Sequence, residues 1–165
     1  MAFWSSYNME PLRKRSFAVQ IDGTDGFSFL AKSVNKPTLE TDVNEYKLIN
    51  QVVKFPTVPK WNEITIKYVE TADQGISKKL LKMMTPKQTI NSGWTAGAIE
   101  KHPKGKQSPI AAMTIVQYDS EKNPKSTWKF KNPFIRSINF GDYDYSSDEF
   151  VEVEVVVVYD WAYLE

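Results

Sequence analysis

The sequence predicts a mainly β fold, an antiparallel β-sandwich or barrel flanked by one α-helix. Three observations support it: short segments alternate apolar and polar residues, turn-forming residues separate them, and one stretch has the spacing of an amphipathic helix. The 165 residues fit a single domain. We expect an N-terminal arm over 1–15 and one β domain over 16–165, with a long hairpin arm at about 38–58.

Composition argues against several classes of protein. The chain has 21 basic and 20 acidic residues and a formal net charge of +1, a balance unlike that of a dedicated nucleic-acid binder. It has no cysteine, so neither disulfides nor thiolate metal sites are expected. No run of about 18 apolar residues occurs, and the N-terminus lacks the apolar core of a signal peptide. We therefore expect no membrane association.

The N-terminal arm carries three large aromatic side chains, Phe3, Trp4 and Tyr7, in a segment without a clear period. Apolar groups of this size need a surface on which to be buried. Packing on the chain's own domain and docking on a neighbouring chain are equally compatible with the sequence. The three residues are candidate interface residues.

The β pattern begins at 16–22, where apolar residues at alternate positions share one face. Turn residues follow at 22–26, and 27–34 resumes the alternation. The two strands are predicted to pair as a hairpin.

The segment 35–58 predicts two extended stretches around a turn near Asn50, bounded by Pro37 and Pro56. A long hairpin of this kind offers a sheet edge to another chain. Its candidate interface residues are Glu45, Tyr46, Lys47, Leu48, Ile49, Val53 and Phe55.

Further strands are expected at 62–70, 111–118, 126–131, 133–140 and 150–161. Not counting the two stretches of the hairpin arm separately, the sequence predicts seven or eight strands. The last of these is the most regular, because valines at alternate positions occupy one face. Glu152 and Glu154 lie on the opposite face.

One helix is predicted between Asp73, which caps its first turn, and Pro86, which ends it. The apolar stripe consists of Ile76, Leu80, Leu81 and Met84. We interpret this stripe as core packing. The long loop at 87–109 that follows is rich in Gly, Lys and Ser, and loops of this length are usually functional or mobile.

No pattern in the sequence is typical of catalysis, cofactor binding or metal coordination. The single histidine, His102, lies among lysines that disfavour protonation and metal capture alike. The glycines lack the spacing of a phosphate-binding loop. The acidic segment 141–149 lacks the central glycine and ligand spacing of an EF-hand and is interpreted as a solvated turn. We predict no catalytic, cofactor-binding or metal-ligating residues.

Three stretches form a more specific pattern. The first is the short arm and strand at 11–23, followed by Gly26-Phe27 and the small residues at 31–34. The second consists of the segments Glu45-Tyr46-Lys47, Val53-Lys54-Phe55-Pro56 and Asn62-Glu63-Ile64-Thr65-Ile66-Lys67. The third is the valine-rich end that finishes in Tyr159-Asp160-Trp161. Together they resemble the tail tube family of contractile-tailed, T-even-like bacteriophages, which is related to the tube proteins of type VI secretion systems and pyocins. The likeness covers nearly the whole chain. It departs from the family at Thr57, where the family has glycine, and at 48–51, where a glycine pair is expected.

The resemblance implies the tail-tube fold and a structural subunit, not an enzyme. In this family, homohexameric rings stack into a hollow tube inside a contractile sheath, and DNA and the tape measure protein pass through it. The implied partners are further copies of the chain and the sheath, tape measure, baseplate and tail terminator proteins, and DNA passes without specific binding. The implied location is the virion, after assembly in the host cytoplasm.

A conduit must not bind its cargo, because each neutralised phosphate adds affinity. Glu152 and Glu154 are therefore hypothesised to face the lumen, where they would repel DNA; a solvated outer face is equally compatible with the alternation.

Two other interpretations stay open. A tube-initiator baseplate protein or the inner tube of a contractile injection system would share the fold. A small-molecule-binding β-barrel, a different class, needs an open cavity, whereas large residues such as Phe17 and Trp128 are expected to fill a core.

Overall fold

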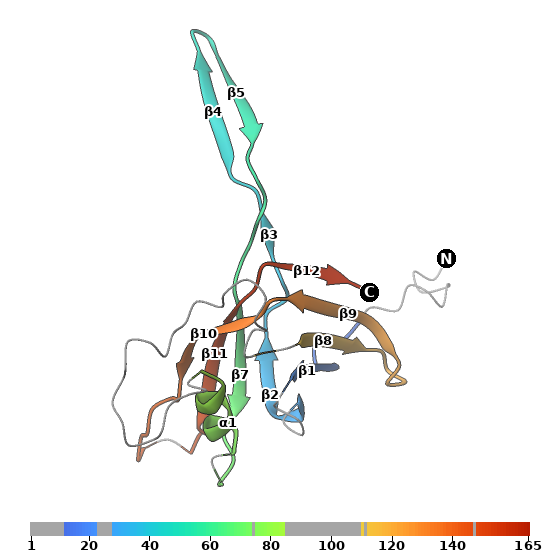
Figure 1. Ribbon diagram of the computed structural model, residues 1–165, viewed down its shortest axis with the longest axis vertical. Helices are drawn as coiled ribbons and strands as arrows, with labels where there is room; N and C mark the ends of the chain where they lie inside the picture. Colours follow the sequence, from blue (N-terminus) through green and yellow to red (C-terminus); the bar gives the residue numbers. More distant parts are fainter. Residues whose placement is uncertain (1–11, 23–27, 74, 85–109, 111, 147) are drawn as a thin grey trace.

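The computed structural model describes residues 12–22, 28–73, 75–84, 110, 112–146 and 148–165 (Figure 1). Within these residues the chain forms two four-stranded antiparallel sheets, a projecting hairpin arm and one α-helix. The expected mainly β fold with a flanking helix is confirmed. The two sheets form an open sandwich and not a closed barrel, because each has two edge strands.

The first sheet joins strands from both ends of the chain in the order β1-β8-β9-β12. Its strands are β1 (Phe17–Ile21), β8 (Met113–Tyr118), β9 (Pro124–Lys131) and β12 (Trp161–Leu164). All three pairings are antiparallel. Alternate side chains on these strands, including Val19, Met113 and Phe130, are buried, as expected for a sheet with one face on the core.

The second sheet has the order β10-β11-β7-β2. Its strands are β10 (Phe134–Asn139), β11 (Glu152–Val158), β7 (Ile64–Val69) and β2 (Ala31–Val34), and a single 3-10 turn, η2 (Ser28–Leu30), precedes β2. The register places Val155 opposite Ile66, so buried side chains of neighbouring strands meet on one face. That face is covered by the first sheet and the helix.

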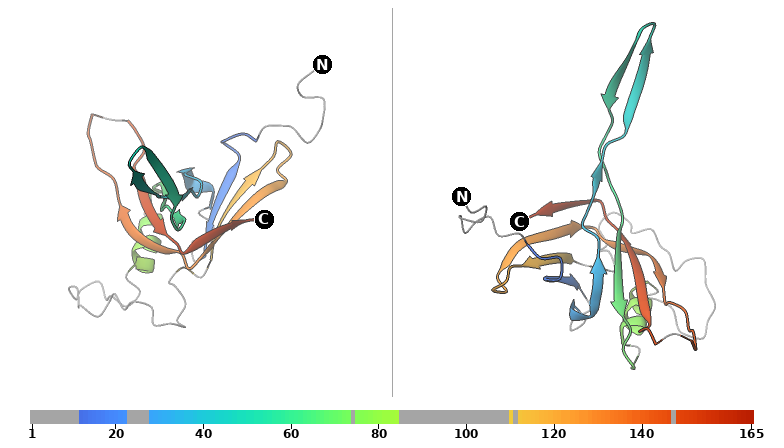
Figure 2. Two further views of the ribbon diagram at one scale, coloured as in Figure 1. Left: turned by 90° about the horizontal axis from the view of Figure 1, so that it is seen from above. Right: turned by 180° about the vertical axis from the view of Figure 1, so that it is seen from behind.

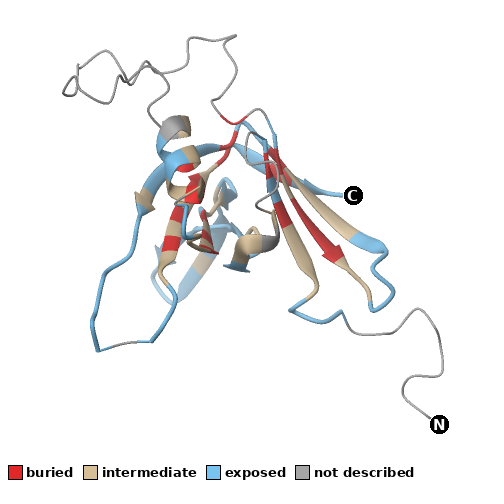
Figure 3. Ribbon diagram, turned by 90° about the horizontal axis from the view of Figure 1, so that it is seen from below, coloured by how far each residue is buried: buried red, intermediate tan, exposed pale blue. Residues whose placement is uncertain are grey.

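The core lies between the inner faces of the two sheets (Figure 3). The valines that alternate along β11, Val153, Val155 and Val157, have no exposed surface at all. Fully burying a side chain of this kind stabilises the fold by about 1.5–3 kcal/mol, so this strand is one of its main supports. The ring of Tyr159 packs edge-on against Phe130 at a centroid distance of 4.9 Å, which links the end of β11 to the first sheet.

The predicted hairpin between 16–22 and 27–34 is wrong. β1 pairs with β8 through five residue pairs, whereas β2 pairs with β7 in the other sheet. Part of the second segment is the 3-10 turn η2 and not a strand. Both segments carry an apolar face, and placing them in opposite layers brings these faces together across the core, which a hairpin within one layer cannot do.

The strand expected at 150–161 is divided in two. β11 ends at Val158, the chain bends, and β12 begins at Trp161 in the other sheet. The bend is held by hydrogen bonds: the Asp160 N–H donates to the Lys131 carbonyl at 3.0 Å, and the Asn132 amide donates to the Asp160 carboxylate at 2.6 Å. The chain therefore crosses from one layer to the other at this point.

The helix α1 (Gly75–Met84) forms where it was expected. The Asp73 carboxylate accepts a hydrogen bond from the Gly75 N–H at 3.3 Å, as an N-terminal cap does. The Thr71 hydroxyl, and after it this N–H, lowers the pKa of the Asp73 carboxyl below its usual range. Ile76 and Leu80 are buried in the core as predicted, but Leu81 is half exposed, because it lies at the edge of the stripe.

Four strands form the hairpin arm, which projects far from the body of the molecule (Figures 1 and 2). β3 (Leu39–Glu40) and β6 (Lys60–Trp61) pair at its base, and β4 (Val43–Leu48) and β5 (Gln51–Pro56) pair in its outer part. The short strands β3 and β6, like β12, were not expected as separate elements.

Some expectations concern residues outside the described part of the chain. These are the aromatic residues Phe3, Trp4 and Tyr7 of the N-terminal arm, the loop at 87–109 and His102.

Candidate interaction surface

The outer part of the hairpin arm has two chemically different faces. Directly opposite residues on paired strands point to the same side, and this side alternates along the strand. The register pairs Tyr46 with Val53 and Asn44 with Phe55 on one side. It pairs Glu45 with Lys54 on the other. Leu48 shares the side of Tyr46, so we call the set Tyr46, Leu48, Val53 and Phe55 the apolar face of the hairpin.

The opposite face carries charged residues beside apolar ones. The Lys54 ammonium lies 3.3 Å from the Glu45 carboxylate, across the two strands. Lys47 and Val52 follow on the same face nearer the tip, and Val43 lies on it nearer the base. An exposed ion pair of this kind contributes little to stability. The charged groups make this face more polar than the apolar face.

The apolar face is exposed to an extent that a single chain does not explain. The exposed fractions are 63% for Tyr46, 55% for Phe55 and 50% for Leu48, and Ile49 at the tip is fully exposed. No residue of β4 or β5 belongs to the core cluster. An isolated two-stranded hairpin is marginally stable in water. An apolar patch on such an element indicates a surface that another molecule covers.

The hairpin also offers unpaired backbone. Within the described residues, β4 and β5 form a two-stranded sheet of their own, so each has one free edge. A free edge presents N–H and C=O groups to a strand of another chain. The surface therefore combines an apolar face with two hydrogen-bonding edges.

The two strands of the arm are joined at its base, and one of them contacts the core. The N–H of Thr57 donates to the Asp42 carbonyl at 2.8 Å, and the Lys60 ammonium lies 2.9 Å from the Asp42 carboxylate, so these contacts hold the two halves of the arm together. The Trp61 ring lies 6.1 Å from the ring of Tyr159, which belongs to the core. This ring contact attaches the base of the arm to the body.

Glu152 and Glu154, the hypothesised lumen residues, share the outer face of the second sheet, but each has a cationic neighbour. The Lys32 ammonium donates to Glu152, and the Lys67 ammonium lies 3.6 Å from Glu154. The hydrogen bond from Lys32 is the main cause that lowers the pKa of Glu152. Arg136 likewise pairs with Glu63. This face is thus a set of paired charges and not an acidic surface.

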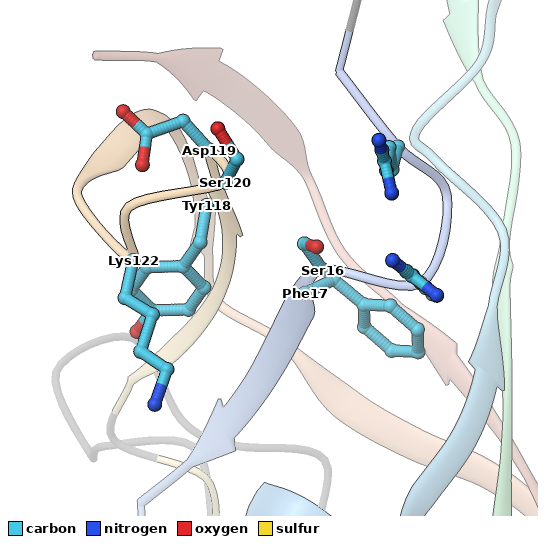
Figure 4. A pocket seen from close by; sticks show the side chains of 8 residues that line it. Ser16, Phe17, Tyr118, Asp119, Ser120 and Lys122 are labelled. Carbon is cyan, nitrogen blue, oxygen red and sulfur yellow. The ribbon is translucent and has the colours of Figure 1, made fainter.

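A hollow lies beside the first sheet, at the start of β1. It has a volume of about 630 Å³ and is lined by Arg13, Arg15, Ser16, Phe17, Tyr118, Asp119, Ser120 and Lys122 (Figure 4). We call it the basic pocket. No sequence pattern indicated it, because it forms only where 13–17 and the turn after β8 come together.

The described residues hold no group of three or more histidine, cysteine, aspartate or glutamate side chains suited to a metal ion. Among the described residues, two buried hydroxyls, those of Tyr68 and Tyr159, have no hydrogen-bond partner. Burial raises the pKa of Tyr68 well above its usual range and that of Tyr159 to about 12. Both therefore stay neutral and act as core side chains.

None of the helices in the described part of the chain has the length and apolar character needed to cross a membrane.

Comparisons with known structures agree with this fold. The chain is similar to a chain in the sheath–tube complex of an extracellular contractile injection system (PVC) in its extended state, at 17% identity and a TM-score of 0.67, with 98% of each chain covered. It is similar to a chain of the anti-feeding prophage baseplate at 9% identity and a TM-score of 0.69, covering 94% of this chain and 96% of that one. A type six secretion system protein matches at 10% identity and a TM-score of 0.52, covering 87% and 78%. At these identities the likeness concerns the fold.

No curated protein sequence matches the chain significantly. The family model described as T4-like virus tail tube protein gp19 matches residues 13–162. That span includes the hairpin arm, the helix and both sheets except the last two residues of β12. The chain belongs to the T4-like tail tube protein family.

Proposed function

We propose that this tail tube protein forms homohexameric rings that stack into a hollow conduit inside a contractile sheath. DNA and the tape measure protein pass through that conduit, and the subunit acts by assembly and not by catalysis. Sheath, baseplate and terminator proteins complete the set of partners, in a virion assembled in the host cytoplasm. The observation that carries the proposal is the hairpin arm, whose apolar face is uncovered in the single chain.

The arm suits a contact between successive subunits. Its base contacts the core through Trp61 and Tyr159, and its outer part extends beyond the body that carries it (Figure 1). A second copy that covers Tyr46, Leu48 and Phe55 removes their apolar surface from water, and its backbone satisfies a free strand edge. Because every copy carries the same arm, the contact repeats and the assembly grows.

The paired charges on the outer face of the second sheet suit a wall that does not retain DNA. Lys32 and Lys67 are neutralised by Glu152 and Glu154, so few cations are available to displace counterions from phosphates. We propose that this face lines the lumen. The repulsion expected of Glu152 and Glu154 is then replaced by a nearly neutral wall, which neither repels nor attracts DNA strongly.

Negative-stain electron microscopy of the concentrated protein tests the proposal. We expect stacked rings or hollow tubes with sixfold averages. Replacing Tyr46 and Val53 together by serine is expected to abolish tubes, whereas replacing Lys47 and Lys54 by serine on the opposite face is the matched control and leaves them. Tubes that form equally well from the Tyr46→Ser, Val53→Ser variant would contradict the role of the apolar face.

A further inference from the structure

The basic pocket has a surplus of cations. Within the described residues, none of Arg13, Arg15 and Lys122 has a carboxylate within 4.0 Å, whereas Asp119, on the same wall, is paired with Lys125 at 3.4 Å. Phe17 and Tyr118 add ring surface that is only half buried. The pocket therefore suits an acidic ligand that also carries aromatic groups.

The turn that carries Lys122 is held in place by its own hydrogen bonds. The Asp119 carboxylate accepts from the Glu121 N–H at 2.9 Å and from the Asn123 N–H at 2.8 Å, and Lys122 takes a left-handed backbone conformation with φ of 64°. Because the backbone of the turn is already fixed before a ligand binds, binding at Lys122 costs less conformational entropy than binding at a flexible loop.

A complementary segment lies elsewhere on the same chain. The stretch 142–149, between β10 and β11, has four acidic residues and no basic one. Two of its tyrosines, Tyr143 and Tyr145, are 88% and 113% exposed, values that leave both rings uncovered. The Ser146 N–H and hydroxyl both donate to one oxygen of Asp144, at 2.8 and 2.7 Å. The loop is thus ordered locally at Asp144 and Ser146, and its two tyrosine rings are uncovered. We call it the acidic loop.

The two surfaces lie on opposite flanks of the body. Figure 2 shows the acidic loop beside β10 on one flank and the turn between β8 and β9 on the other. The separation excludes a contact within one chain. Complementary patches on opposite flanks are the geometry of a head-to-tail interface, which closes into a ring when the rotation between copies permits it.

We propose that the acidic loop of one subunit docks in the basic pocket of the next subunit around the ring. Asp142 and Asp144 meet the cations of the pocket, and Tyr143 or Tyr145 packs on Phe17 and Tyr118. The occupant is a second copy of this chain. The segment 1–11 is a poorer match in charge, because Glu10 is its single acidic residue. The proposal rests on the ring assembly proposed above, and it specifies the lateral contact, whereas the hairpin arm specifies the contact between rings.

Site-directed cross-linking tests the contact, and the absence of native cysteine makes the test clean. The full-length variant with Lys122→Cys and Asp144→Cys is assembled and treated with a short bismaleimide. We expect a ladder of covalent species up to the hexamer. Each single-cysteine variant is the control, because a head-to-tail contact cannot link identical sites into a ladder.

Charge reversal supplies an independent readout. Arg15→Glu is expected to raise the protein concentration needed for ring formation about tenfold, because like charges then face each other across the contact. Adding Asp144→Arg to the same chain is expected to restore the original concentration. Lys131→Glu, the same charge change at an exposed residue outside the pocket, is expected to leave it unchanged.

The outcomes separate the two proposals. Rings of the double-cysteine variant without a covalent ladder, or charge reversal without rescue, would overturn the docking of the acidic loop and leave the tube function standing. A wild-type protein that forms no rings at any concentration would count against the tube function itself, and the docking would fail with it.

Discussion

Substituting Phe55 by serine separates the role of the hairpin in assembly from its role in folding. The side chain belongs to the apolar face, lies outside the core and is 55% exposed in the single chain. Because about half of the side chain is exposed and none of it belongs to the core, the variant is expected to fold, with a smaller loss of stability than a core substitution causes. The substitution is expected to weaken assembly, because the phenyl group of Phe55 is proposed to be covered by another subunit in the tube.

The magnitude follows from the exposed area. A phenylalanine offers roughly 200 Å² of surface, so about half of it, or about 100 Å², remains to be buried in the tube. At about 25 cal/mol per Å², the loss is about 2.5 kcal/mol for each contact. This corresponds to a decrease of roughly 50- to 100-fold in the association constant.

Two assays measure the two effects. Sedimentation velocity over a range of concentrations gives the concentration at which tubes appear, and thermal unfolding at low concentration gives the stability of the free subunit. Val52→Ser is the matched control, because Val52 is 50% exposed on the opposite face of the same hairpin. Equal losses of assembly in both variants would refute a contact through one face. A large loss of subunit stability in Phe55→Ser would show that this side chain serves folding and not assembly alone.

Three further predictions concern the subunit alone. Gly141→Ala is expected to destabilise the fold by about 1–3 kcal/mol in thermal unfolding, because Gly141 has φ of +78° and an added Cβ would lie 2.6 Å from the Glu152 carbonyl oxygen; unchanged stability would contradict it. Asp73→Ala is expected to lower the temperature of thermal unfolding through loss of the helix cap, whereas Asp73→Asn is expected to keep most of the stability because asparagine also caps helices. Since Lys32 lowers the pKa of Glu152, this pair stabilises the fold above the unfolded pKa of about 4.3, and the stability is lost as pH falls through the lower folded value. Glu152→Gln should therefore reduce stability at neutral pH and lose its effect in acid; an effect that persists in acid would exclude this cause.

The sequence predicts well those features that depend on local periodicity. The alternating valines of β11 and the spacing of Ile76 and Leu80 each require only that neighbouring positions share an environment, and the structure buries them as expected. The two faces of the hairpin arm follow from the same alternation once its register is known.

Pairing between distant segments is less accessible from sequence. β1 pairs with β8, almost a hundred residues away, and nothing in the turn residues that follow β1 identifies that partner. The bend after Val158 depends on Asp160 reaching Asn132 and Lys131, so its position appears only in the folded chain. The basic pocket was missed for the same reason, since its two walls are distant in the sequence.

The most direct test of the account is a helical reconstruction of the assembled tube by cryo-electron microscopy. We expect sixfold rings in which Tyr46, Leu48 and Phe55 of each subunit are covered by a subunit of the adjacent ring. A tube in which the apolar face of the hairpin remains exposed to solvent would contradict the central claim that this surface drives assembly.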